Sequence, residues 1–146
     1  MNASHCLKIA ACVSVCVCSL AATACDDLVI KNAWIREPPP IARVAAGYME
    51  IANTGGEART VHQVESACCE HLMMHDSVSD GDNVRMSHLD RLTVQPGESI
   101  QFLPRGRHLM LMAPAQPLVD GDSVEIDFRC AVGEPVRATF DIIKMR

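Results

Sequence analysis

The chain is organised around the segment HDSVSDGDNVRM, residues 75–86. Its central dipeptide, Asp80-Gly81, is typical of the two-residue turn of a type I′ β-hairpin. A turn at this position pairs His75 with Met86 across the two strands, with their Cβ atoms about 4.5–5.5 Å apart. The segment therefore predicts a hairpin that presents an imidazole and a thioether side by side.

A second segment of the same character is HLMLM, residues 108–112. His108 and Met110 are two residues apart, so on a strand they share one face and lie about 6.6 Å from each other along the chain. The complete spacing is His-x10-Met-x21-His-x-Met. If this second strand lies beside the hairpin, its two side chains and those of His75 and Met86 can converge on a single ion.

The four residue types indicate which ion this is. A thioether sulfur is soft and neutral, and a set of imidazoles and thioethers without a carboxylate favours Cu(I) over magnesium, calcium or zinc. Four protein donors also fill a tetrahedral shell, whereas a catalytic metal keeps one position open for substrate. A single Met in an apolar strand is most often a packing residue, but the joint spacing favours a Cu(I) site in a carrier rather than in an enzyme.

The same spacing resembles that of the periplasmic copper chaperones of the PCu(A)C family. Three further blocks resemble the family: NAWIREPPP (32–40), AAGYMEIAN (45–53) and HLDRLTVQPGES (88–99). The resemblance implies a cupredoxin-like β-sandwich in which Cu(I) is bound by His75, Met86, His108 and Met110. It also implies a copper-accepting partner, such as cytochrome c oxidase subunit II with its dinuclear copper centre, or a Sco-type thiol protein.

Two positions depart from the family pattern. Members often have Gly-Gly-Tyr before His-Leu-Met, where this chain has Arg105-Gly106-Arg107. Members also often place a Met two residues after the first His, where this chain has Ser77. We therefore expect the rim of the site to differ from that of the family.

The composition fits an exported single domain. Residues 1–24 read as a secretory signal, with Lys8, an apolar run over 9–21 that is too short to span a membrane, and an Ala-x-Ala cleavage site at 22–24. The domain then covers residues 25–146 in the periplasm. Ala22 stands where a lipobox prefers Leu, which favours ordinary cleavage, and the membrane is a partner only if Cys25 is lipidated instead. The formal net charge of −5 without a basic cluster excludes nucleic acid as a partner.

The cysteines outside the predicted signal peptide are expected to form one disulfide. They are Cys25, Cys68, Cys69 and Cys130, in a compartment that permits disulfides. Adjacent Cys68 and Cys69 point to opposite faces in an extended chain, so at most one of them faces inward toward Cys130. We expect Cys130 to pair with Cys68 or Cys69, and the alternative is that the adjacent pair acts as copper or redox thiols.

The remaining pattern predicts an all-β fold, a Greek-key β-sandwich. Short apolar segments alternate with Pro- and Gly-containing turns, and no helical stretch of any length occurs. The expected strands are Leu28–Ile35, Val44–Ala52, Arg59–Val64, Cys69–Val78, Val84–His88, Leu92–Val94, Ser99–Leu103, His108–Met112, Ser123–Cys130 and Val136–Ile143.

Further candidates lie on the same predicted face. The expected hairpin register pairs Met73 with His88, and this pair is a candidate for a second ion. Met112 is a candidate spare thioether, although core packing explains it more simply. His71 lies about 13 Å from His75 along an extended strand, too far to share an ion with it.

Two other classes of function compete with the carrier. An electron-transfer cupredoxin needs two His, one Cys and a weak axial Met, and no Cys lies between His75 and Met110. A β-sandwich that serves only in adhesion or assembly would use these His and Met residues structurally. An oxidised blue-copper protein absorbs strongly in the visible range, whereas a Cu(I) carrier is colourless.

Overall fold

The computed structural model describes residues 24–80 and 83–145, so most of the predicted signal peptide lies outside the described part. Every regular element of the described part is a strand, and none of its residues forms a helix that could cross a membrane. The strands are β1 (Leu28–Arg36), β2 (Val44–Asn53), β3 (Arg59–Val61), β4 (Gln63–Glu65), β5 (Cys69–Asp80), β6 (Asn83–His88), β7 (Leu92–Val94), β8 (Ser99–Phe102), β9 (His108–Pro114), β10 (Ser123–Arg129) and β11 (Val136–Ile143).

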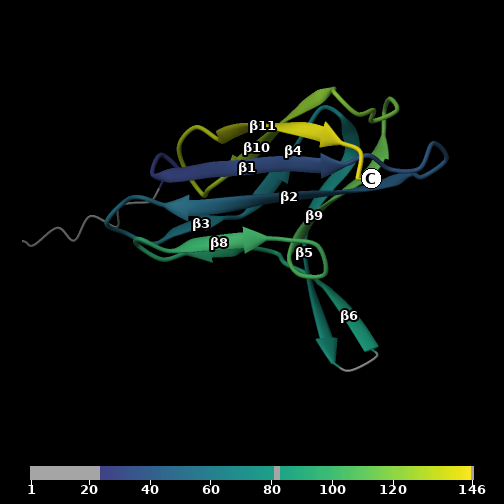
Figure 1. Cartoon of the computed structure of the whole chain (residues 1–146). Helices are drawn as coiled ribbons and strands as arrows, with labels where there is room; N and C mark the ends of the chain where they lie inside the picture. Colours follow the sequence, from purple (N-terminus) through teal and green to yellow (C-terminus); the bar gives the residue numbers. More distant parts are fainter. Residues whose placement is uncertain (1–23, 81–82, 146) are drawn as a thin grey trace, which may run out of the picture.

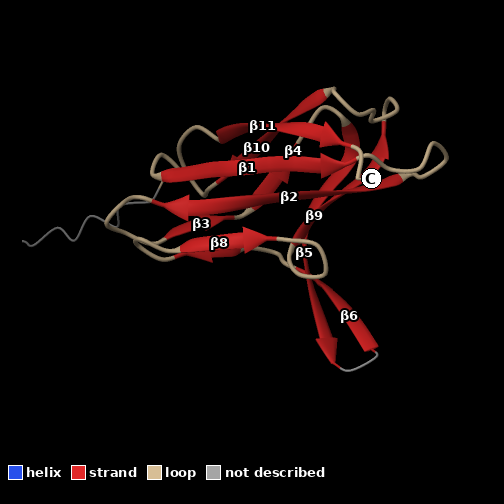
Figure 2. Ribbon diagram, viewed as in Figure 1, coloured by secondary structure: helices blue, strands red, loops and turns tan. Residues whose placement is uncertain are grey.

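The strands form a β-sandwich, as predicted (Figure 2). One sheet has the order β4-β10-β11-β1-β2-β9-β5-β6, with β8 also paired to β2, and β3 and β7 form a separate pair. The first half of β2 pairs with β9 and its second half pairs with β8, so β2 changes its partner midway along its length. β1 and β11 pair in parallel, and the other pairings are antiparallel.

The core is built by alternation along the strands. In β10, Ile126 and Phe128 are fully buried, while the charged residues that alternate with them, Glu125, Asp127 and Arg129, are not. In β9, Leu109 and Leu111 are fully buried. Because successive side chains of a strand point to opposite faces, this burial turns His108 and Met110 to the other face of the sheet.

Strand β5 is long enough to take two partners in succession. Its first part, from Cys69 to His75, pairs with β9, and its last part, from His75 to Asp80, pairs with β6. The β5–β6 hairpin consequently extends beyond the body of the sandwich (Figure 1). His75 is the residue at which β5 passes from one partner to the other.

The predicted hairpin register is wrong, because each residue of β5 pairs two residues further along β6 than predicted. His75 pairs with His88, and Met86 pairs with Ser77, so His75 does not face Met86 and Met73 does not face His88. A two-residue turn can end with Gly in type I′ or begin with Gly in type II′. Asp80-Gly81-Asp82 satisfies both, so the dipeptide alone did not determine which residues pair.

The predicted disulfide is also wrong in its partner. Cys130 is bonded to Cys25, with their Cα atoms 5.5 Å apart, and Cys68 and Cys69 are free. β10 runs antiparallel to β11, and β11 runs parallel to β1, so the end of β10 lies near the start of β1. Ser66 donates to the carbonyl of Glu125 near the start of β10, which places Cys68 and Cys69 toward the end of β10 that is remote from Cys130.

Candidate metal centre

Three imidazoles lie in a row across β6, β5 and β9. His75 occupies the middle position, directly opposite His108 on β9 and directly opposite His88 on β6. The ring centroids of His75 and His108 are 5.7 Å apart, and those of His75 and His88 are 5.6 Å apart. Both pairs meet edge to face, so His75 has an imidazole neighbour on each side.

The two predicted thioether ligands lie on the same face as this row. Met110 lies two residues from His108 and faces Met73 across β5 and β9. Met86 faces Ser77, one step diagonally from His75, and it is 54% exposed. The structure thus brings the four sequence-predicted residues to one face around His75, with Met86 at the outer, accessible side.

The local chain fixes the tautomer of His108. His108 is 9% exposed, and its Nδ1 lies 3.0 Å from the carbonyl oxygen of Gly106. A carbonyl only accepts, so Nδ1 must carry the hydrogen and donate it. The lone pair of His108 is therefore on Nε2, the arrangement found in metal-ligating histidines whose other nitrogen is held by the backbone.

The turn before β9 positions that carbonyl. Arg105 adopts a left-handed conformation with φ of 70°, and the amide of Gly106 donates to the carbonyl of Leu103 at 3.0 Å. At the next position, Arg107 Nε lies 3.4 Å from Asp76 Oδ2. This ion pair joins β5 to the start of β9 beside the His75–His108 pair, so the Arg residues that depart from the family pattern contribute to the frame of the site.

His75 is held neutral and has a nitrogen without a partner. Its Nδ1 is buried and has no hydrogen-bond partner. Burial lowers the pKa of His75 below the ordinary imidazole value, and repulsion from His108 and His88 lowers it further. A buried nitrogen that lacks a partner is costly, and a bound metal ion would satisfy it.

Other His and Met residues on this face lie farther along the strands. His71 faces Met112 across β5 and β9, four residues along β5 from His75 and four residues along β9 from His108. Among residues 24–80 and 83–145, no three His, Cys, Asp or Glu side chains gather around one point. The thioethers of Met86 and Met110 are therefore needed to complete a four-donor set around His75 and His108.

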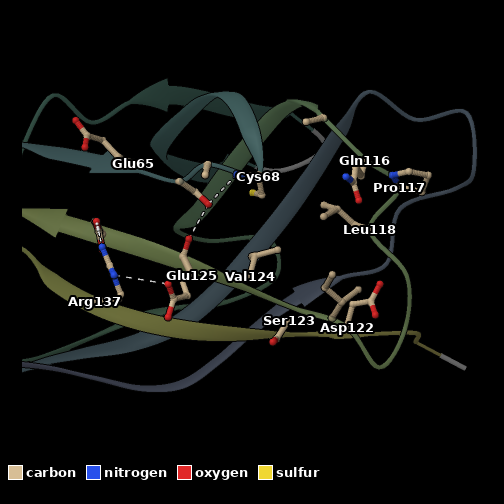
Figure 3. A pocket seen from close by; sticks show the side chains of 15 residues that line it. Glu65, Cys68, Gln116, Pro117, Leu118, Asp122, Ser123, Val124, Glu125 and Arg137 are labelled. Atoms are coloured by element: carbon tan, nitrogen blue, oxygen red, sulfur yellow. Dashed lines mark hydrogen bonds and ion pairs between the residues drawn. The ribbon is translucent and has the colours of Figure 1, made fainter.

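A separate hollow of about 850 Å³ lies beside Cys68 (Figure 3). Leu118, Val124 and Glu125 also line it, and Arg137 reaches Glu125 across it at 3.7 Å. None of the four predicted ligands belongs to its lining in the described part of the chain. Its size does not make it a Cu(I) centre, because its described lining offers carboxylates and one thiol, but no imidazole or thioether.

The two free thiols should differ in reactivity. A hydrogen bond from the Cys69 thiol lowers the pKa of Cys68 to about 6, and the same hydrogen bond raises the pKa of Cys69. Because the thiolate is the nucleophile, iodoacetamide at pH 7 should modify Cys68 at least about tenfold faster than Cys69. Peptide mapping by mass spectrometry after short labelling measures both rates, and equal rates would contradict this pairing.

Comparisons with known proteins give a matching family. The family model described as "Putative lipoprotein LpqE-like" matches residues 28–142. A curated relative, "Putative lipoprotein Lxx21020" of Leifsonia xyli subsp. xyli, is 23% identical over 109 residues. The match covers 74% of this chain, and the chain spans 64% of the length of that relative.

Solved structures share the fold. The copper-bound PCuAC domain from PmoF2 is 18% identical with a TM-score of 0.69, covering 82% of this chain and 94% of that domain. The solution structure of CuI-DR1885 from Deinococcus radiodurans is 22% identical with a TM-score of 0.63, covering 85% of this chain and 83% of that one. The predicted cupredoxin-like β-sandwich is therefore confirmed.

Proposed function

Because the chain belongs to the LpqE-like family, which is a PCuAC-type family, and has the fold of copper-binding PCuAC domains, we propose that it is a copper carrier. It binds one Cu(I) through His75, Met86, His108 and Met110. The observation that carries this proposal is the pair of facing imidazoles, one with a buried unpartnered nitrogen and the other with its lone pair fixed on Nε2.

The donor set suits a carrier rather than an enzyme. Imidazole and thioether donors hold Cu(I) through neutral, polarisable atoms, and four of them leave no open position for a substrate. Met86 is the most exposed of the four, so an incoming ligand can replace it first. An acceptor with Cys thiolates, such as cytochrome c oxidase subunit II or a Sco-type protein, would then bind the ion more strongly.

The alternative of an electron-transfer cupredoxin fits the geometry less well. A blue-copper site needs a thiolate within the ligand set. Cys25 and Cys130 are bonded to each other, and Cys69 lies six residues along β5 from His75. The absence of an intense visible band from the copper-loaded, oxidised protein would separate the carrier from this alternative.

Metal analysis after anaerobic loading with Cu(I) tests the proposal. We expect one copper per mature chain, residues 25–146, and an X-ray absorption spectrum that shows a mixed nitrogen and sulfur shell. A shell of sulfur alone would place the copper on Cys68 and Cys69 and would overturn the assignment. Failure to retain copper at all would favour the assembly module.

The pH dependence of Cu(I) affinity should follow the histidines. Thioethers carry no proton, whereas each imidazole must be neutral to bind. Since the pKa of His75 lies below its ordinary value, protons compete for His75 only at more acidic pH than about 6.5. Affinity should be nearly flat from pH 7 to 9 and should fall in acid, by up to about a hundredfold per pH unit once both imidazoles are protonated.

A competition titration between pH 5 and 9, with a chelator of known pH response, measures this profile. A flat acid limb would remove the histidines from the site. A steep slope that continues above pH 7.5 would instead place a thiol among the ligands, because an ordinary thiol titrates near pH ~8.5.

We also propose that the mature chain is a periplasmic protein without a lipid anchor on Cys25. The sulfur of Cys25 is bonded to Cys130, and one sulfur atom cannot form both a disulfide and a lipid thioether. The intact mass of the exported protein tests this proposal. We expect the mass of residues 25–146 less two hydrogens, and an added diacylglyceryl group would contradict it.

A further inference from the structure

Cys68 and Cys69 are the free cysteines among residues 24–80 and 83–145, and their thiols are in contact. In an extended chain, adjacent side chains point to opposite faces. Cys68 instead belongs to a turn, and β5 begins only at Cys69, so the Cys69 thiol can donate a hydrogen bond to the sulfur of Cys68. This hydrogen bond lowers the pKa of Cys68 to about 6, which favours the nucleophilic thiolate at neutral pH.

Three hydrogen bonds hold the turn that carries Cys68. The amide of Cys68 donates to Ser66 Oγ at 3.2 Å, and Ser66 Oγ donates to the carbonyl of Glu125 at 2.6 Å. The amide of Ala115, directly after β9, donates to the carbonyl of Cys68 at 2.9 Å. The backbone of Cys68 is thus tied to β10 and to the end of β9, which holds its sulfur beside that of Cys69.

The hollow of about 850 Å³ gives a reactant access to Cys68. Cys68 lies in its wall together with Gln116, Leu118 and Val124 (Figure 3). Cys69 is not among the described residues that line it. Of the two thiols, Cys68 is therefore the one that meets a reactant in the hollow, and Cys69 stands behind it.

The charges around the hollow favour a neutral reactant. Its described lining carries the carboxylates of Glu65, Asp122, Glu125 and Asp127 and the single cation of Arg137. Arg137 donates to Asp127 at 2.7 Å and lies 3.7 Å from Glu125, so negative charge remains after this pairing. A negative lining repels anions, whereas a small uncharged oxidant can reach the sulfur.

We propose that Cys68 and Cys69 reduce neutral hydroperoxides, an activity beyond the proposed copper function. The Cys68 thiolate attacks the terminal oxygen of the hydroperoxide and the O–O bond breaks. The released alkoxide or hydroxide takes up a proton, and Cys68 becomes a sulfenic acid. The sulfur of Cys69 then attacks that of Cys68, the S–O bond breaks, and the hydroxyl leaves with the Cys69 proton as water. Two electrons pass from the thiol pair to the peroxide, and a disulfide joins the two residues.

A low-molecular-weight thiol returns the pair to its reduced state. Consecutive Cα atoms lie about 3.8 Å apart, whereas the Cα atoms of an ordinary disulfide are about 4.4–6.8 Å apart. A disulfide between adjacent residues is therefore strained, and strained disulfides are easily reduced. Two molecules of the small thiol reduce it and become a disulfide themselves, so the pair can turn over.

This chemistry does not need the candidate metal centre. Cys69 and His75 lie six residues apart on β5, about 20 Å along the strand. The Cys25–Cys130 bridge contributes no thiol, so thiol loss from the mature chain, residues 25–146, reports Cys68 and Cys69 alone. The activity can consequently be measured on copper-free protein, and its result is independent of whether the chain carries copper.

The test adds one equivalent of hydrogen peroxide to the copper-free mature chain at pH 7, with a metal chelator present. Both thiols should be lost, the mass should fall by two hydrogens, and reduced glutathione should restore both. Cys69→Ser should stop at the sulfenic acid, which dimedone traps on Cys68. Cys68→Ser should react at least about tenfold more slowly, because the remaining thiol has a raised pKa.

The two single variants are matched controls, since each keeps one sulfur of the same pair. A thermal midpoint within a few degrees of the unmodified chain shows that each is folded. Equal rates in the two variants, a dimedone adduct on Cys69, or retention of both thiols in the unmodified chain would overturn the inference. A faster reaction with a negatively charged hydroperoxide than with hydrogen peroxide would overturn the assigned substrate class.

Discussion

Replacing Met110 with Leu should lower the affinity of the mature chain for Cu(I) by at least about a hundredfold, or about 2.7 kcal/mol. Leu and Met have similar volumes, so the exchange costs little packing energy, but it removes the sulfur donor. Met110 lies in β9, two residues from His108 and on the same face. The loss of one of four donors leaves Cu(I) with an incomplete shell. Competition against a Cu(I) chelator at pH 7.5 gives the affinity of each variant.

Met112→Leu is the matched control for this experiment. Met112 lies in the same strand and on the same face, is half-buried like Met110, and faces His71 rather than Met73. We expect its Cu(I) affinity to stay within about threefold of the unmodified chain. Equal losses in the two variants would mean that copper lies between Met110 and Met112 on the His71 side. No loss in either would remove β9 thioethers from the site.

The face that carries the candidate site could be predicted from the sequence because it depends only on the two-residue period of a strand. The observed pairing shifts each partner on β6 by two residues from the predicted one, so His75 and Met86 stay on one face. The partner of His75 depends on the turn, and two turn types fitted the same three residues. For this reason the sequence placed His88 beside Met73, and its position opposite His75 emerged only from the structure.

The bounds of a strand were predictable where turn-forming residues mark its ends clearly in the sequence. β7 and β11 have the predicted bounds, and in β10 the alternation of apolar and charged residues matches the burial of Ile126 and Phe128. The segment Arg59–Val64, expected as one strand, is instead divided into β3 and β4. The amide of His62, between them, donates to the carbonyl of Arg129 at 2.8 Å. This long-range contact leaves no local signal in the sequence.

The disulfide partner was not predictable because it depends on strand order. Alternation identified Cys130 as a residue at the end of a strand, but only the parallel pairing of β11 with β1 brings Cys25 to it. The tautomer of His108 was not predictable either. The carbonyl of Gly106 can accept from His108 only when Arg105 adopts its left-handed conformation. Residue types suggested the ligands, and tertiary contacts determine how they are oriented.

Breaking the Cys25–Cys130 disulfide should lower the free energy of unfolding by about 2–5 kcal/mol. The two residues are 105 positions apart, so the bridge restricts nearly the whole unfolded mature chain, and long loops are where the entropic effect is largest. Cys25 is fully buried beside the start of β1, so the bridge also holds that strand to the end of β10. The midpoint of thermal unfolding should fall by about 10 °C or more, measured on the same protein before and after reduction.

Copper binding should survive this loss, because the bridge and the imidazole row belong to different parts of the sheet. The doubly substituted Cys25→Ala, Cys130→Ala chain should bind one Cu(I) with unchanged affinity at temperatures below its lowered midpoint. Cys68→Ser, Cys69→Ser is the matched control, since it removes two half-buried free thiols and no covalent bond, and its midpoint should change by only a few degrees. An equal fall in both variants would mean that the bridge contributes nothing beyond side-chain packing. Loss of copper from the Cys68→Ser, Cys69→Ser chain alone would move the metal from the histidine and methionine face to the adjacent thiols.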